Sequence, residues 1–171
     1  VYVLFCCFFL SWFEFYAKGI CNERLGNWEI AEIDFRKALA MEPNQPSLLN
    51  YFGYSLVEKG IHLEEALELI RRAVRGQPND GYITDSLGWA LYRLGKYSEA
   101  VTHMERATEL MPLDPIINDH LGDVYWAVER HTEAEFQWRR ALSFDPEEKD
   151  AERIYKKLDI GLDAVLISET E

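Results

Sequence analysis

The chain has 171 residues, of which 48% are hydrophobic and 28% charged, and its formal net charge is -12 at pH 7. This composition supplies enough apolar side chains for one folded core and excludes a disordered tail. The negative charge disfavours binding to nucleic acid, since no cluster of basic residues offsets repulsion by phosphates. Most of the excess lies in residues 79–171, where it either keeps the surface soluble or selects a neutral to basic partner.

The first segment, residues 1–13, is an almost wholly apolar run, VYVLFCCFFLSWF. It is shorter than the roughly 20 residues of a membrane-spanning helix, and no basic segment precedes it, so it is not a complete signal peptide. Three interpretations stay open: a remnant of a membrane or export segment, a wrongly assigned start, or a buried partner of the first helices. Cys6, Cys7 and Cys21 show no disulfide or metal-ligand pattern.

Beyond this run the sequence repeats itself with a period of 34 or 35 residues, which is typical of a repeat architecture. The recurring residues are Gly19, Gly53, Gly88 and Gly122; Ala31, Ala66, Ala100 and Ala134; Ala38, Ala73, Ala107 and Ala141; and Pro43, Pro78, Pro112 and Pro146. Between these positions the apolar pattern predicts helix pairs at 12–25 with 28–41, 46–59 with 62–76, 80–94 with 97–110, and 114–128 with 131–144.

The recurring residues have a physical role in such pairs. Small residues such as Gly88 and Ala100 allow two antiparallel helices to approach each other closely. Glycines such as Gly95 lie where the first helix of a pair should end, and each proline lies where the second helix cannot continue. Asn79, Asp80 and Asp114 are expected to cap the first helix of the third and fourth pairs or to form the turn before it.

Some positions depart from the repeat. The first unit has Lys18 and Asn22 where the others have apolar residues, so it should be the weakest. The second unit has one extra residue after Gly60, and Glu129 replaces the turn glycine in the fourth. After Pro146, one further helix is expected to cover the apolar face of the last unit, as the end of a repeat stack requires. Its apolar stripe consists of Ile154, Leu158, Leu162, Val165 and Leu166.

These positions resemble the tetratricopeptide repeat family, whose pattern has a small residue at position eight, alanines at positions twenty and twenty-seven, and a proline near the end. The match covers residues 12–146 and is clearest in GYITDSLGWALYRLGKYSEAVTHMERATELMPLDP. The resemblance implies an all-α fold, a right-handed α-solenoid of four antiparallel helix pairs with a C-terminal capping helix. The expected regions are an apolar N-terminal segment (1–13), a repeat domain (14–146, with repeats at about 12–45, 46–80, 81–114 and 115–146), and the capping helix and tail (147–171).

No motif in the chain predicts catalysis or a bound cofactor. The chain lacks GxxxxGK[ST], GxGxxG and GxSxG, and none of its four histidines forms an i, i+4 pair for a metal. The best ligand set, formed by Asp119, His120 and Asp123, is weak. We therefore expect a protein that is not an enzyme and needs neither a metal nor another cofactor.

In the resembling family, the first helix of each pair lines the concave surface. Carried over to this chain, the resemblance predicts a groove for a peptide or protein segment lined by Asn50, Tyr54, Tyr82, Asp85, Trp89, Tyr92, Asp119, Asp123 and Trp126. The aromatic residues would contact the ligand and the carboxylates would favour cations or hydrogen-bond donors. Alternatively, Trp89 and Trp126 pack the repeats against each other.

The leading hypothesis is a protein–protein interaction scaffold or adaptor, binding a neutral to basic protein or peptide and no nucleic acid. The alternative is a structural role through self-association or a membrane-associated complex, in which the N-terminal apolar run docks onto another subunit or a membrane. The segment DSLGWALYRLGKYSEA also resembles bacterial envelope repeat proteins. That resemblance favours the bacterial periplasm or envelope over the cytoplasm.

Overall fold

A computed structural model describes residues 11–169, which form ten helices and no strand. Eight of the helices form antiparallel pairs: α1 (Trp12–Arg24) with α2 (Trp28–Met41), α3 (Pro46–Lys59) with α4 (Leu63–Gly76), α5 (Gly81–Arg93) with α6 (Tyr97–Leu110), and α7 (Pro115–Ala127) with α8 (His131–Leu142). Two further helices follow, α9 (Glu148–Ile160) and the shorter α10 (Leu162–Ser168). The predicted fold class, an all-α solenoid of helix pairs, is confirmed.

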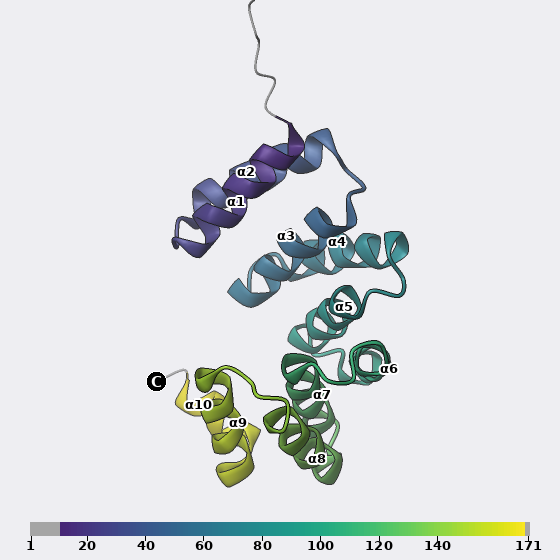
Figure 1. Cartoon of the computed structure of the whole chain (residues 1–171), viewed down its shortest axis with the longest axis vertical. Coiled ribbons are helices and arrows are strands. Elements are labelled where there is room, and N and C mark those ends of the chain that lie inside the picture. Colours follow the sequence, from purple (N-terminus) through teal and green to yellow (C-terminus); the bar gives the residue numbers. More distant parts are fainter. Residues whose placement is uncertain (1–10, 170–171) are drawn as a thin grey trace, which may run out of the picture.

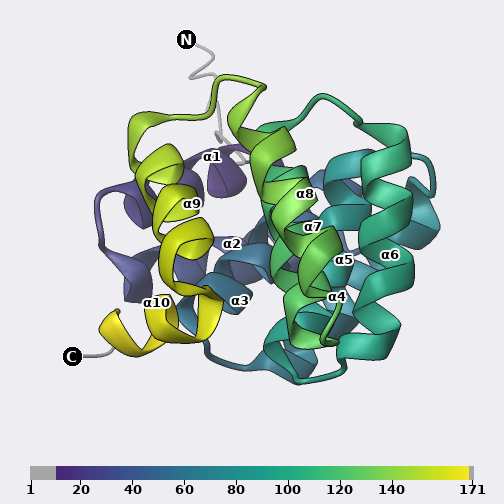
Figure 2. The same ribbon diagram turned by 90° about the horizontal axis from the view of Figure 1, so that it is seen from below.

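The helix pairs stack along the long axis in chain order, from α1–α2 to α7–α8, and their path curves (Figure 1). The C-terminal helices α9 and α10 lie beside α7 and α8, as both views show (Figure 2). The first helices of the second, third and fourth pairs, together with α9 and α10, therefore border the open side of the curve.

The period of the sequence follows from close packing within each pair. A Cβ atom at Gly53 of α3 would lie 2.7 Å from Cγ1 of Ile70 in α4, and one at Gly88 of α5 would lie 2.8 Å from Cγ of Met104 in α6. Alanines occupy the corresponding crowded positions of the second helices, and Ala66 and Ala100 are fully buried. Small residues recur because any larger side chain would separate the two helices.

The turns explain the departures from the repeat. Glu129 has φ 63°, the left-handed conformation that Gly26, Gly60 and Gly95 adopt in the earlier units. A second left-handed residue, His62, accommodates the extra residue of the second unit with φ 49°. The turns thus keep the same geometry even where glycine is replaced, at the cost of backbone strain.

The predicted caps are also present. The Asp80 carboxylate accepts a hydrogen bond from the backbone N–H of Ile83 at 3.0 Å. The carboxylate of Asp114 accepts from the backbone N–H groups of Ile116 and Ile117 at 2.9 and 3.0 Å. Since α5 and α7 supply most of the predicted groove residues, these caps fix where the groove helices begin.

The two ends of the stack are packed less fully than its middle. The apolar run of residues 1–13 lies outside the described residues except for its last part, in which Trp12 and Phe13 begin α1. Only Gly19 is buried in α1, in keeping with the expected weakness of the first unit. No helix within residues 11–169 is both long enough and apolar enough to cross a membrane.

The C-terminal segment forms two helices where the sequence predicts one. Gly161, with φ 83°, separates α9 from α10. The chain passes so close to Trp126 at this point that a Cβ on Gly161 would lie 3.0 Å from the indole ring. After the change of direction at Gly161, the side chains of Leu162 and Val165 of α10 are buried.

Candidate functional site

Along the concave side, polar contacts join the first helix of one pair to the first helix of the next, α3 to α5 and α5 to α7. Trp89 of α5 donates its indole N–H to the Glu58 carboxylate of α3 at 2.7 Å. His120 of α7 lies 3.0 Å, through Nδ1, from the carboxylate of Asp85 in α5. These contacts fix the side chains that line the groove, because each is held from a neighbouring repeat.

Three aromatic rings form a stack at the centre of this surface. The ring of Trp89 lies parallel to that of Tyr92, with centroids 4.8 Å apart, and to that of His120, with centroids 4.1 Å apart. Trp89 is only 9% exposed. The structure therefore gives Trp89 a packing role between repeats while leaving one edge at the groove.

Burial and the neighbouring carboxylates change the pKa of His120 in this stack in opposite directions. Burial by itself lowers the pKa of His120, but the carboxylates of Asp85, Asp119 and Asp123 outweigh that effect and raise the pKa above its ordinary value. The imidazole consequently tends to stay protonated, and its charge offsets the buried carboxylate of Asp85.

The two carboxylates of α7 that the sequence assigns to the groove are bound by cations from α9. The Lys157 ammonium donates to Asp119 at 2.8 Å and to Asp123 at 2.6 Å, and its side chain is fully buried. Asp123, 1% exposed, also accepts a hydrogen bond from the indole N–H of Trp138 at 2.9 Å. Burial and the neighbouring Asp123 raise the pKa of Asp119 to about 6, although Lys157 opposes the rise.

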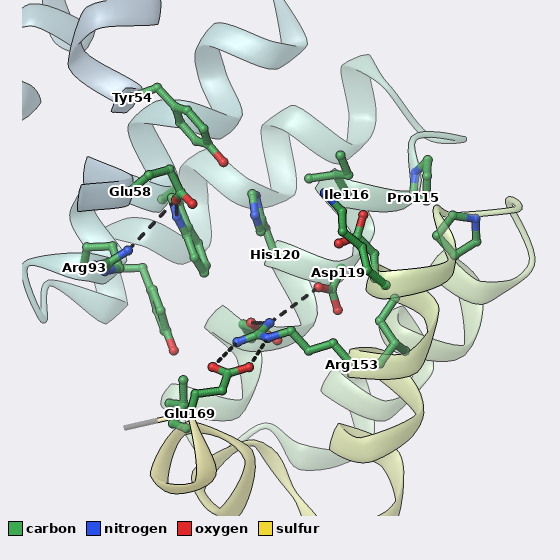
Figure 3. Close-up of a pocket in the computed structure, with 17 residues that line it drawn as sticks. Tyr54, Glu58, Arg93, Pro115, Ile116, Asp119, His120, Arg153 and Glu169 are labelled. Atoms are coloured by element: carbon green, nitrogen blue, oxygen red, sulfur yellow. Dashed lines mark hydrogen bonds and ion pairs between the residues drawn. The ribbon is translucent and has the colours of Figure 1, made fainter. Parts of the chain in front are cut away.

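The main cavity, about 590 Å³ in volume, lies between these groups and the C-terminal helices. Figure 3 shows Tyr54, Ile116 and Arg153 extending toward the same space from α3, α7 and α9. Arg153 spans its floor, with Nε 2.8 Å from Glu169 and Nη1 3.5 Å from Asp123. Its lining residues are Tyr54, Glu58, Trp89, Tyr92, Arg93, Pro115, Ile116, Asp119, His120, Asp123, Pro146, Lys149, Asp150, Arg153, Ile154, Leu166 and Glu169.

A smaller cavity of about 200 Å³ lies beside the first, with which it shares Tyr54 and Ile116. Its lining residues are Asn50, Tyr51, Tyr54, Tyr82, Asp85, Ser86, Asp114, Ile116 and Ile117. Within the described part of the chain, Oδ1 of Asn50 is buried and has no hydrogen-bond partner. A buried acceptor without a partner is an exception in a folded protein.

Eight of the nine predicted groove residues line one or both of these cavities, and Trp126 lines neither. Trp126 instead donates its indole N–H to Asp163 of α10 at 3.1 Å and lies with its ring 4.2 Å from that of His131. The turn at Gly161 packs against the indole ring of Trp126.

Several of the lining residues that the sequence analysis does not assign lie in the C-terminal segment, among them Lys149, Asp150, Arg153 and Glu169. The repeat period contains a signal for two contacts beside the cavities. Asp85 and His120 are 35 residues apart, and Asp123 and Lys157 are 34 apart, so both contacts join positions one repeat apart on neighbouring inner helices. Within residues 11–169, no group of three or more His, Cys, Asp or Glu side chains lies close enough together to hold a metal ion.

Comparison with known proteins identifies the fold. Two tetratricopeptide repeat (TPR) family profiles match residues 16–81 and 85–114. The chain belongs to the tetratricopeptide repeat family. One relative, TPR repeat-containing protein PA4667 of Pseudomonas aeruginosa, is 35% identical over 89 residues, which make up 52% of this chain and 15% of that protein. This TPR chain thus spans a small part of the relative's length.

Solved TPR structures share the architecture at low identity. PilF of Pseudomonas aeruginosa is 18% identical with a TM-score of 0.72, over 91% of this chain and 72% of that chain. MamA of Desulfovibrio magneticus RS-1 is 22% identical with a TM-score of 0.70, over 78% and 75%. YrrB, described as a TPR protein with an unusual peptide-binding site, is 23% identical with a TM-score of 0.69, over 85% and 75%. The TPR fold is generally that of a non-enzymatic protein-interaction scaffold.

Proposed function

We propose that this TPR chain is a non-enzymatic scaffold whose concave groove binds an extended or helical segment of a protein partner. The observation that carries the proposal is the pair of adjoining cavities along α3, α5 and α7. Tyr82 and Ile116, which are 55% and 49% exposed, extend from this surface. Because Tyr54 and Ile116 border both cavities, a single segment can run from one cavity into the other.

The groups along the groove suit a polypeptide ligand. Exposed aromatic side chains bury a large area at a small entropic cost, which makes them frequent contacts in interfaces. The similarity of fold to YrrB, with its peptide-binding site, is in keeping with this choice of ligand.

We infer a neutral to basic partner from the net charge of -12 on the chain as a whole. The sequence analysis assigns this selection to Asp85, Asp119 and Asp123. In the structure these carboxylates face His120, Lys157 and Arg153 of the same chain. The preference for a neutral to basic partner therefore rests on long-range attraction by the net negative charge of the chain, and less on direct contact of the partner with these three carboxylates.

A peptide selection tests the groove. Peptides that bind the wild-type chain would be isolated from a random library, and their affinities measured again with the double variant Tyr82→Ala, Ile116→Arg. Both side chains are exposed, so the fold should survive, whereas substitution of Trp89 or Asp123 would disturb buried contacts. We expect a loss of affinity of at least about tenfold, the usual effect of removing interface anchors.

The matched control is Phe136→Arg in α8, which alters a 61% exposed aromatic residue that lines neither cavity. Affinity should stay at the wild-type level in this variant. Equal loss in both variants, or loss in the control alone, would place the binding surface outside the groove and overturn the proposal.

The second candidate is self-association, which one further observation favours. Ile30 and Ile33 are each 53% exposed and lie three residues apart on one face of α2. Light scattering across a range of concentrations would test this candidate with the variant Ile30→Lys, Ile33→Lys. A wild-type dimer that the variant converts to a monomer would support assembly, and a wild-type monomer throughout would count against it.

A further inference from the structure

The main cavity has two facing walls, and only one of them belongs to the repeats. Ile116 of α7 borders it from the repeat side, and Leu166 of α10 borders it from the C-terminal side with 39% of its surface exposed. Both are large apolar side chains that line the same cavity and are partly exposed to solvent there. Contact with a ligand would remove that surface from water and so stabilise the complex.

We infer that this cavity receives one bulky, uncharged side chain of the bound segment, so that α9 and α10 form half of an anchor site in addition to covering the last repeat. This inference rests on the proposed function, since it names the anchor of the same groove. A volume of about 590 Å³ falls in the range of roughly 300–1,000 Å³ that is usual for ligand sites. It has room for a Phe, Leu or Met side chain with its adjoining backbone.

The pairing of most charged groups in the lining disfavours a charged anchor. Asp119 and Asp123 are paired with Lys157, and Glu169 with Arg153. The other charged groups lie in opposite pairs: Glu58 with Arg93 at 4.0 Å, and His120 with Asp85 at 3.0 Å. Of the two remaining charged lining residues, Lys149 pairs with Glu147 at 3.3 Å, and Asp150 has no ion pair within residues 11–169.

At every lining carboxylate except Asp150, a cationic anchor would have to displace a cation of the chain, and an anionic anchor would have to compete with carboxylates for Arg153. Either exchange costs desolvation of a charged side chain with little gain in pairing. An uncharged side chain enters without disturbing these pairs.

The shape of the repeat wall agrees with a bulky apolar anchor. Trp89 is held rigid between Tyr92 and His120, and its indole N–H is already used by Glu58. The groups that border the cavity from this stack thus offer fixed aromatic edges. Rigid aromatic walls favour aromatic or aliphatic side chains, since no rotamer freedom is lost on binding.

Methyl NMR on the full chain tests the inference with three probes: N-acetyl-phenylalanine amide, N-acetyl-lysine amide and N-acetyl-glutamate amide. Ile116, Ile154 and Leu166 supply methyl reporters in the lining. We expect the phenylalanine probe to shift these methyl signals saturably, with a dissociation constant on the order of a millimolar, as is usual for so small a ligand. The two charged probes should bind at least about tenfold more weakly.

The variant Leu166→Arg should abolish the shifts at Ile116, whereas Ile160→Arg, which alters a 53% exposed residue of α9 outside the lining, should preserve them. Stronger binding of the lysine probe, no saturable shift with any probe, or unchanged phenylalanine binding by Leu166→Arg would overturn the inference. Library-selected peptides separate this outcome from failure of the proposed function. If they lose affinity with Tyr82→Ala, Ile116→Arg but keep it with Leu166→Arg, the groove binds its partner without the anchor.

Discussion

The third repeat and the C-terminal helices are attached to the molecule in different ways. In α5, ten of thirteen residues are buried, and most of them are apolar or small. In α9, only Ile154 and Lys157 of thirteen are buried, and α10 adds Leu162 and Val165. The inner helix of a central repeat has neighbours on both sides, whereas the last element of a solenoid has a neighbour on one side only.

The difference separates the groove into a rigid wall and a weakly held wall. The rigid wall comes from α5 and α7, whose side chains are fixed by the stack around Trp89. The weakly held wall depends on a buried cation, Lys157, between two carboxylates. Segments with few buried apolar contacts open at a lower free energy than the core, so α9 and α10 should open before the repeats unfold.

The largest expected effect comes from breaking the ion cluster. Lys157→Met leaves Asp119 and Asp123 buried without their ammonium partner, and removal of one partner from a buried pair costs about 3–5 kcal/mol. We expect hydrogen exchange in α9 and α10 to accelerate strongly, while protection in α5 is kept. The matched control is Lys149→Met, which alters a 76% exposed side chain of the same helix and should change little. Unchanged exchange in α9 of Lys157→Met would show that the ions do not hold this wall.

A matched pair of leucine substitutions compares the two regions with the same chemistry. Leu91 in α5 and Leu162 in α10 are each 1% exposed. Truncation of a buried leucine to alanine typically costs about 2–5 kcal/mol. Leu91→Ala should lower the urea midpoint of the whole chain, whereas Leu162→Ala should act mainly on exchange in α9 and α10. Equal losses of global stability would mean that both regions unfold as one cooperative unit.

The pH dependence of the rigid wall follows from His120. Its pKa is higher in the fold than in the unfolded chain. It therefore stabilises the fold at pH values below its unfolded pKa of about 6.5, and this contribution is lost as the pH rises through the folded value. Thermal unfolding should occur at lower temperature as the pH is raised above 6.5. His120→Gln keeps a donor for Asp85 without a titrating group, so this decline should become smaller. An equally steep decline in that variant would assign the effect to another group.

The smallest expected effect concerns the turn that precedes α8. Glu129 is in the left-handed conformation, with φ 63°, and glycine adopts that conformation without the penalty of roughly 1–2 kcal/mol that a Cβ imposes. Glu129→Gly should stabilise the chain by up to about 1 kcal/mol. This gain is smaller than the full penalty, because glycine also has more conformational entropy in the unfolded state, which offsets part of it. Gly95→Ala, at φ 73° with no neighbouring atom to clash, should destabilise it by a similar amount. Calorimetric melting temperatures that fail to move in opposite directions would refute this account of the turns.

The rigid wall was largely predictable from the sequence. The repeated glycines locate the close approach of helices, as the contact of Gly88 with Met104 illustrates. The caps at Asp80 and Asp114 identify the starts of α5 and α7. Both signals are local or periodic, so composition and spacing alone carry them.

The weakly held wall was harder to predict because it follows a single segment that has no further repeat to fix its place. A lysine on a charged helix indicates a solvated side chain, so the buried contact of Lys157 with Asp123, 34 residues earlier, was not predicted. The division of the segment at Gly161 depends on packing against Trp126. Such a contact between distant residues leaves no pattern in the sequence.

The groove is tested most directly by hydrogen-exchange footprinting of the full chain with a bound library-selected peptide. If the groove is the binding surface, protection should increase in α3, α5 and α7, and also in α9 and α10 if these helices form half of the anchor site. Protection confined to the outer helices α2, α4, α6 and α8 would contradict the central claim that the concave side binds the partner.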